Sequence, residues 1–126
     1  MLRTKIPQTR LTPNGSTADP AGTAIDATNG HYIDCSLLRM ERMSIRIVNT
    51  AGSTKVATIL HGENPPADRA SDGSLVVTLA AGATAFVGPL TSARFVKAGS
   101  LVYIDCEAGM TGSITAFAVA DATAMQ

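Results

Sequence analysis

The stretch that decides the fold class runs from Thr84 to Ile104 and reads TAFVGPLTSARFVKAGSLVYI. Its apolar runs predict short strands at about 84–88, 91–96 and 100–106. Gly88-Pro89 interrupts the first two runs, because proline has no N–H for a sheet ladder and glycine weakens a strand interior. We therefore expect a corner there, where a strand bends or the chain changes sheet. The stretch as a whole indicates an antiparallel β domain.

The rest of the chain continues this pattern, and further runs predict strands at 30–36, 42–49, 54–61, 74–80 and 113–119. The run 42–49 alternates most clearly, with Met43, Ile45 and Ile47 on one face and Arg42, Ser44 and Arg46 on the other. The connection Asn49–Ser53 contains a glycine suited to a tight turn, so 42–49 and 54–61 are expected to form a hairpin. Before them, residues 37–43 predict a turn or a single helical turn.

About eight strands at roughly ten-residue spacing predict an all-β fold, namely a single antiparallel β-sandwich or jelly-roll-like domain. Closely spaced prolines and glycines exclude helices from residues 1–29, which we expect to form an extended N-terminal arm with a short strand near Thr23. Residues 30–120 form the predicted β-sandwich domain. Residues 121–126 are expected to be a C-terminal tail.

The composition limits the classes of function expected for this chain. The chain has 126 residues, of which 45% are hydrophobic but only 4% aromatic, with no tryptophan. A core of such small side chains favours burial in an oligomer. Ten basic and ten acidic residues give zero net charge, so no basic surface for nucleic acid is expected. Without an apolar run of about twenty residues or an apolar stretch after the basic start, we expect a soluble protein without membrane contact, made in the cytosol.

No motif for catalysis or cofactor binding is visible in the sequence, since a phosphate-binding loop, a dinucleotide fingerprint and a nucleophile elbow are all missing. Asp34 and Asp105 are the acid pair considered, and both are expected to be solvated. The possible zinc ligands are His31, Cys35, His61 and Cys106. Their spacing is poor, because His31 and Cys35 would lie about 13 Å apart on one strand. We therefore expect no catalytic residue, no cofactor and no metal.

The pattern Tyr-Ile-Asp-Cys occurs twice, at 32–35 and 103–106, in two predicted strands. The repeat raises the hypothesis that these strands are neighbours in the fold. The two cysteines are expected to be reduced, buried thiols that behave as small hydrophobic residues. The aromatic residues of the predicted strands are expected in the core, namely Tyr32, Phe86, Phe95, Tyr103 and Phe117.

The charges of the first eighteen residues are all positive, since Arg3, Lys5 and Arg10 precede the first acid, Asp19. Two interpretations remain open at this point. The segment is either an ordinary solvated terminus or an arm that docks on an acidic neighbour.

An ordered series of segments gives the chain a family resemblance: Val48–Val56, Gly62–Ala67, Leu75–Thr84, Gly88–Val96, Gly99–Asp105 and Thr111–Phe117. The series resembles small virion proteins encoded among the head genes of tailed bacteriophages, of the head-decoration or capsid-cement kind. The resemblance covers about residues 30–120. The N-terminal third departs from the family, so no arm contacts are transferred from it.

The resemblance implies a β-rich structural protein of the virion that is not an enzyme. It implies binding to the outside of a capsid built of a major capsid protein, often as a homotrimer, and bridging of neighbouring capsid subunits. We expect partner contacts from Arg3, Lys5, Ile6 and Arg10 on the arm. Arg94 and Lys97, beside the predicted corner, are candidates for salt bridges between subunits.

Two alternatives remain. The chain is a tail or neck component, which would polymerise, or a β-sandwich that binds carbohydrate or a host surface. The second alternative usually depends on exposed aromatic residues, and the chain has no tryptophan and only two tyrosines.

Overall fold

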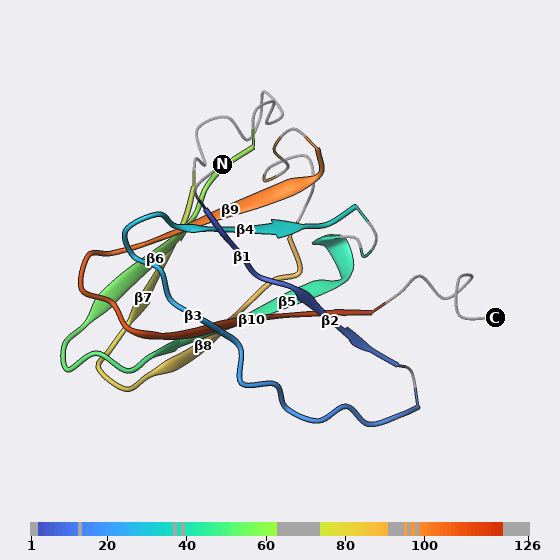
Figure 1. The fold of residues 1–126 in the computed structure, drawn as a ribbon, viewed down its shortest axis with the longest axis horizontal. Helices are drawn as coiled ribbons and strands as arrows, with labels where there is room; N and C mark the ends of the chain where they lie inside the picture. The colour runs from blue at the N-terminus through green and yellow to red at the C-terminus, as the bar shows by residue number, and fades with distance from the viewer. Residues whose placement is uncertain are drawn as a thin grey trace.

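A computed structural model describes residues 3–12, 14–36, 38, 40–62, 74–90, 95, 97 and 99–119. In these residues the chain is all-β, with ten strands and one short 3₁₀ turn, η1, at Met40–Arg42 (Figure 1). The strands are β1 Thr4–Lys5, β2 Gln8–Leu11, β3 Thr23–Ala24, β4 His31–Asp34, β5 Met43–Asn49, β6 Lys55–Ile59, β7 Leu75–Leu79, β8 Thr84–Val87, β9 Leu101–Cys106 and β10 Gly112–Val119. Within this part of the chain, no helix has the length and apolar character needed to cross a membrane.

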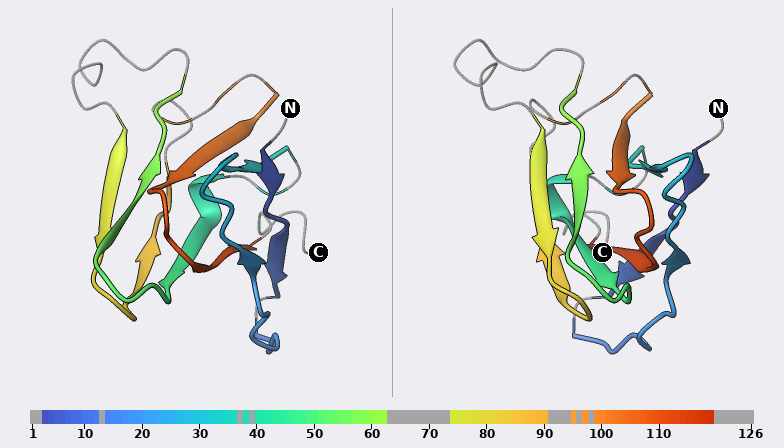
Figure 2. Two further views of the ribbon diagram at one scale, coloured as in Figure 1. Left: turned by 60° about the vertical axis from the view of Figure 1, so that its left-hand side comes forward. Right: turned by 90° about the vertical axis from the view of Figure 1, so that its left-hand side faces the viewer.

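The strands form two mixed sheets of five strands (Figures 1 and 2). Sheet A has the order β1-β4-β9-β6-β7, and sheet B has the order β2-β10-β5-β8, with β3 also paired to β10. The N-terminal strands are parallel to their partners, β1 to β4 and β2 to β10, whereas the other pairs are antiparallel. The expectation of a purely antiparallel domain of about eight strands is therefore wrong, because the N-terminal segment adds strands to both sheets.

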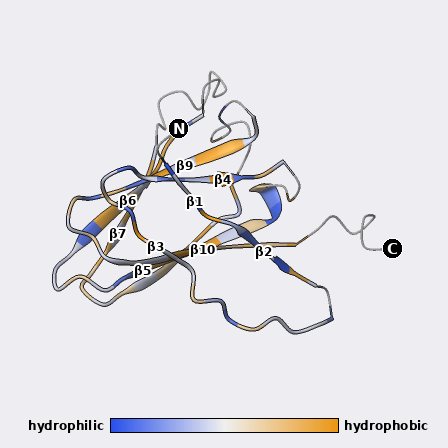
Figure 3. Ribbon diagram, viewed as in Figure 1, coloured by the Kyte–Doolittle hydropathy of each residue, from blue (hydrophilic) through white to orange (hydrophobic). Residues whose placement is uncertain are grey.

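Residues from both sheets contribute to one cluster of buried side chains. The predicted alternation of β5 is confirmed, with Met43, Ile45 and Ile47 fully buried and Ser44 and Arg46 on the outer face. Apolar residues are concentrated in β9 and in part of β10 (Figure 3).

η1 confirms the single helical turn before β5. Seven of the predicted strands are present as β4 to β10. The remaining one, 91–96, lies outside the described residues except for Phe95, which is buried and not in a strand.

The N-terminal segment is the main correction to the predicted organisation. Residues 1–29 were expected to form an arm, but β1 and β2 belong to the two sheets, and β3 confirms the short strand near Thr23. The side chain of Ile6, between β1 and β2, is only 1% exposed and lies in the core. Pro7 follows where the chain passes from one sheet to the other, so its missing N–H costs no ladder bond. The predicted tail, 121–126, lies outside the described residues.

The predicted hairpin of 42–49 with 54–61 is also wrong, because β5 belongs to sheet B and β6 to sheet A. Asn49, at the end of β5, is fully buried. Its side-chain amide donates to the carbonyl oxygens of Ser53, Leu79 and Ala80, each at 3.1 Å. Its Oδ1 accepts from the N–H of Ala51 at 3.0 Å. Asn49 thus joins the two neighbouring connections, β5–β6 and β7–β8, that cross between the sheets.

The predicted corner lies where β8 ends. Gly88 follows the last residue of β8 with φ +116°, and a Cβ atom there would lie 2.5 Å from the carbonyl oxygen of Met43. Only glycine fits this conformation and this close approach. The Gly88-Pro89 peptide is cis. The next strand, β9, belongs to the other sheet, as a corner at this point predicts.

The aromatic residues are placed differently from what was expected. Of the five, only Phe95 is buried, and Tyr32, Tyr103 and Phe117 are half-buried. Phe86 is 70% exposed, so its predicted core position is wrong. The register pairs it with Arg46 on the outer face of β5, which turns Val87 inward instead. Val76 on β7 is also 59% exposed. The strands β7 and β8 lie on one side of the molecule, and β1 and β2 lie on the other (Figures 1 and 2).

Candidate functional site

A group of cations and tyrosines lies on the outer face of sheet A and contains three of the predicted contact residues. We call it the cationic–tyrosine patch, and it consists of Arg3, Lys5, Tyr32, Lys97 and Tyr103. The strand pairing builds it, because Lys5 on β1 lies opposite Tyr32 on β4, which lies opposite Tyr103 on β9. The parallel pairing of β1 thus places N-terminal charges beside residues from the far end of the sequence.

Two cations of the patch share one tyrosine ring. The guanidinium carbon of Arg3 lies 4.4 Å from the ring centroid of Tyr103, and Nζ of Lys97 lies 5.6 Å from the same centroid. Arg3 also forms an ion pair of 2.6 Å with Asp105, whereas the backbone N–H of Lys97 donates to Leu101 O at 2.7 Å. Because Leu101 and Asp105 flank Tyr103 along β9, the two cations reach the ring from opposite ends of the strand.

The patch presents an excess of positive charge and no catalytic geometry. Arg3 is only 21% exposed and is already paired with Asp105, so it mainly fixes β1 against β9. Lys5 is exposed and Lys97 is half-exposed. Ammonium groups beside tyrosine hydroxyls suit the binding of carboxylates or backbone carbonyls on another protein.

The other predicted contact residues do not belong to the patch. Ile6 is buried in the core, so the expectation that it contacts a partner is wrong. Arg10 is exposed on β2, which belongs to sheet B. Arg94 lies outside the described residues. Of the six predicted contact residues, three therefore lie together in the patch, and Ile6 and Arg10 do not join them.

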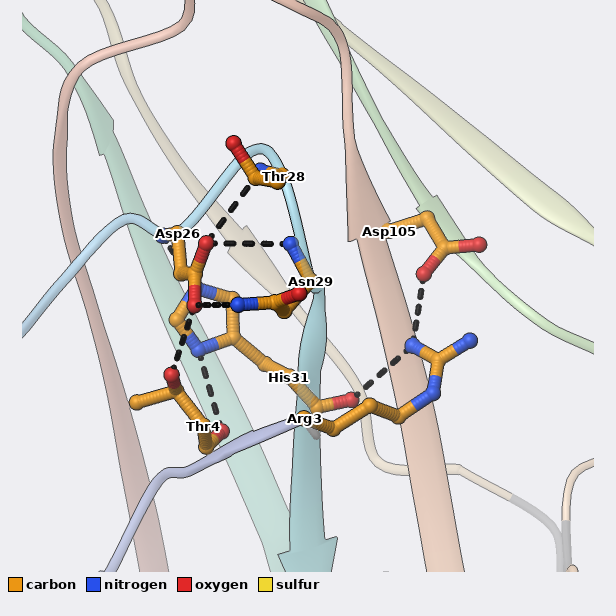
Figure 4. Close-up of polar contacts among 7 residues, drawn as sticks. All are labelled: Arg3, Thr4, Asp26, Thr28, Asn29, His31 and Asp105. Carbon is orange, nitrogen blue, oxygen red and sulfur yellow. Dashed lines mark hydrogen bonds and ion pairs between the residues drawn. The ribbon is translucent and has the colours of Figure 1, made fainter. Parts of the chain in front are cut away.

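A second polar cluster joins β1 to β4 and contains residue types of a catalytic triad, Thr4, Asp26 and His31 (Figure 4). Its hydrogen bonds differ from those of a triad. The Thr4 hydroxyl donates to Oδ2 of Asp26 at 2.8 Å, and the backbone N–H of Asp26 donates to Nε2 of His31 at 2.8 Å. Nδ1 of His31 lies 3.2 Å from the carbonyl oxygen of Thr4. The imidazole thus contacts backbone atoms of Thr4 and Asp26, and it is fully buried, so the cluster connects strands rather than activating a nucleophile.

The turn before β4 is ordered by the Asp26 carboxylate. Its Oδ1 accepts from the N–H groups of Thr28 at 3.2 Å and Asn29 at 3.0 Å. The bond from the Asn29 N–H has the largest effect and lowers the pKa of Asp26 below its usual value. The Thr4 hydroxyl and the Thr28 N–H act in the same direction. Sequence reasoning missed this cluster. The signal was present, because Asp-x-x-Asn-Gly is a turn sequence that ends directly before His31.

The strands of the repeated Tyr-Ile-Asp-Cys pattern are neighbours, since β4 pairs with β9 and Tyr32 lies opposite Tyr103. Because the pairing is antiparallel, the Asp and Cys residues that follow the two tyrosines lie at opposite ends of the strand pair. Cys35 donates its N–H to Ser100 O, while Cys106 lies at the far end of β9, and Asp34 and Asp105 are separated in the same way. The described residues contain no group of three or more His, Cys, Asp or Glu side chains suited to hold a metal.

Both cysteines are buried free thiols. Burial raises the pKa of Cys35 to about 12 and that of Cys106 to about 11. The unreactive thiol form therefore dominates at neutral pH.

We expect a thiol reagent at pH 8 to label Cys35 and Cys106 of the folded chain at least about 100-fold more slowly than a free cysteine, because the thiolate fraction falls tenfold for each unit of raised pKa. Mass spectrometry after timed quenching measures the rate, and the denatured chain is the control. Labelling of the native chain at the rate of the denatured chain would contradict the burial of the thiols.

A cavity of about 240 Å³ lies between β2 and β3, against β10. Its lining carries no ionisable side chain and consists of Pro7, Thr9, Pro20, Ala21, Gly22, Thr23, Ile114 and Thr115. Arg46 fixes the chain beside it, through an ion pair with Asp19 and a 2.9 Å bond to Pro20 O. The only polar side chains of this lining are threonine hydroxyls, and the lining contains no acid or base to activate one.

Comparison with known proteins adds no identification: no family model, no curated protein and no solved structure matches the chain.

Proposed function

We propose that this chain is a structural virion protein that binds the outer surface of a phage capsid and stabilises it by bridging neighbouring capsid subunits. Its partners are the major capsid protein and further copies of itself, in a homotrimer. The family resemblance over residues 30–120 motivates the proposal. The observation that best supports it is the cationic–tyrosine patch, a partly exposed group of cations and tyrosines without catalytic geometry.

A protein that bridges subunits under tension needs contact residues that are firmly attached to its core. The patch meets this requirement, because Thr4 donates its N–H to Gly30 O at 3.0 Å and Ile6 donates to Tyr32 O at 2.9 Å. These bonds and the buried side chain of Ile6 fix the segment that contains Arg3 and Lys5. A load on these two cations would pass into sheet A directly rather than through a loose arm.

The finer architecture that we propose is a β-sandwich, because both sheets contribute to one buried cluster. The homotrimer would form through the β7–β8 side, where Val76 and Phe86 are exposed. That side lies opposite β1 and β2, so one copy could contact the capsid and its own copies at the same time (Figures 1 and 2).

The charge-reversing variants Lys5→Glu and Lys97→Glu are each expected to weaken binding to undecorated capsids by about 10-fold, because each places a negative charge where an acidic partner surface is expected. Cosedimentation of purified protein with capsids, over a range of salt concentrations, measures the affinity. Arg42→Glu, an exposed charge reversal on η1, is the matched control. Unchanged binding by both patch variants would remove the patch from the mechanism.

The two alternatives predict different behaviour. A tail or neck component would polymerise, so light scattering that shows filaments instead of a closed trimer would favour it. A carbohydrate-binding or host-surface-binding sandwich gains support from one observation, the exposed ring of Phe86. Glycan-array binding that disappears in Phe86→Ala would favour that function over capsid binding.

A further inference from the structure

The two nitrogens of His31 make hydrogen bonds that require one protonation state. Nε2 accepts from the backbone N–H of Asp26 at 2.8 Å, so it carries no hydrogen. Nδ1 lies 3.2 Å from the carbonyl oxygen of Thr4, which can only accept, so Nδ1 carries the hydrogen. The neutral ring with its proton on Nδ1 is the form that satisfies both bonds. A proton on Nε2 would face the Asp26 N–H, and two donors cannot bond to each other (Figure 4).

These two bonds join segments that are distant in the sequence. Thr4 begins β1, which contains Lys5 and directly follows Arg3, and Asp26 begins the turn before β4. The ring of His31 is fully buried between them. A doubly protonated ring would have to leave this position or displace Asp26, and either movement breaks the connection between β1 and the turn.

Three charged groups affect the pKa of His31, namely Asp26 in the turn, Arg3 directly before β1 and Asp105 on β9. Burial of the ring has the largest effect and lowers the pKa of His31, and Arg3 acts in the same direction. Asp26, Asp105 and the bond to Thr4 O oppose it. The Asp26 carboxylate is already occupied by Thr4, Thr28 and Asn29, so pairing with the imidazolium would cost these bonds.

We propose that His31 is an acid-sensitive latch: its protonation removes the acceptor of the Asp26 N–H and releases β1 and the turn at residues 26–30 from sheet A. Above the unfolded-state pKa of 6.5 the latch contributes its full stability. Below that pH the open form binds a proton that the closed form does not, so the contribution falls as the pH falls. The latch operates in the free chain and does not depend on capsid binding.

Hydrogen exchange read by NMR tests the latch in the unmodified chain. The probes are the N–H groups of Thr4 and Ile6, which bond to Gly30 O and Tyr32 O, and the reference is Ile45 at the centre of sheet B. After correction for intrinsic exchange rates, we expect protection of the Thr4 and Ile6 amides to fall by up to about 25-fold between pH 7 and pH 5. Protection of Ile45 should change by less than about 2-fold. Equal protection of Thr4 and Ile6 at the two pH values would overturn the proposal, as would a protonated His31 that leaves β1 in place.

Three variants separate the latch from general acid sensitivity. The substitutions H31N and H31Q remove the titrating group, so both should lower protection of β1 at pH 7 and abolish its pH dependence. H61Q removes the other histidine, which is exposed, and should retain the wild-type response. If a His31 variant fails to fold, the wild-type exchange experiment and H61Q still decide the question. A pH response that persists in H31N or H31Q, or that is lost in H61Q, would assign it to another group.

Discussion

Replacing Asn49 with alanine is expected to lower the free energy of unfolding by about 3 kcal/mol, because it removes one buried amide that serves two connections between the sheets. The substitution leaves the carbonyl oxygens of Ser53, Leu79 and Ala80 without this donor, and the N–H of Ala51 without its acceptor. A buried polar group without a partner costs about 1–3 kcal/mol, and partial entry of water keeps the total below the sum. Urea denaturation followed by circular dichroism measures the change.

The variant N49D separates hydrogen bonding from packing, since aspartate has nearly the same shape. Its carboxylate would face three carbonyl oxygens, so we expect at least the loss seen with alanine. The exposed Thr17 provides the control, and T17A should change stability by no more than about 0.5 kcal/mol. An N49D variant as stable as the wild type would show that the Asn49 amide does not hold the β5–β6 and β7–β8 connections together.

The substitution Ile6→Ala is expected to cost about 3 kcal/mol, the usual range for removing a large aliphatic side chain from a core. Ile6 is 1% exposed, and β1 and β2 on either side of it belong to different sheets. Its loss should therefore loosen both sheets at their N-terminal edge. Thermal unfolding measures the effect as a lowered midpoint.

The neighbouring residue provides the matched control for Ile6. Lys5 is exposed, so Lys5→Ala should lower stability by at most about 0.5 kcal/mol while it removes one cation of the patch. The two variants thus separate the structural role of the N-terminal segment from its binding role. Equal stability of Ile6→Ala and Lys5→Ala would mean that the segment behaves as the separate arm that its composition suggested.

Strand positions could be predicted wherever one face of a strand is buried. In β5 the buried Met43, Ile45 and Ile47 alternate with Ser44 and Arg46, and this period of two is visible in the sequence. The charges of the patch could also be named individually, because Arg3 and Lys5 stand in a segment without acids. Their grouping around Tyr103 depends on strand pairing between the two ends of the chain.

The errors arose where long-range pairing decides the outcome. Asn49 has the local signature of a hairpin turn, but its buried amide directs the chain into the other sheet. Pro7 suggested an irregular arm, although it occupies a position that needs no N–H. Phe86 was expected in the core from its type alone, whereas its register with Arg46 turns it outward. Each error concerns which strands meet, and local sequence does not contain that information.

The pairing of β2 with β10 has a consequence for how the chain is made. In the described sheets β2 pairs only with β10, and Arg3 and Asp105 meet across 102 positions of sequence. During synthesis β2 must therefore wait for β10 before this pair can form, and such distant contacts slow folding. After β10 has formed and before β2 docks, the N-terminal segment of a second nascent chain can occupy the open edge of β10. Copies translated together from one mRNA are thus expected to exchange these N-terminal segments, which would join them during synthesis.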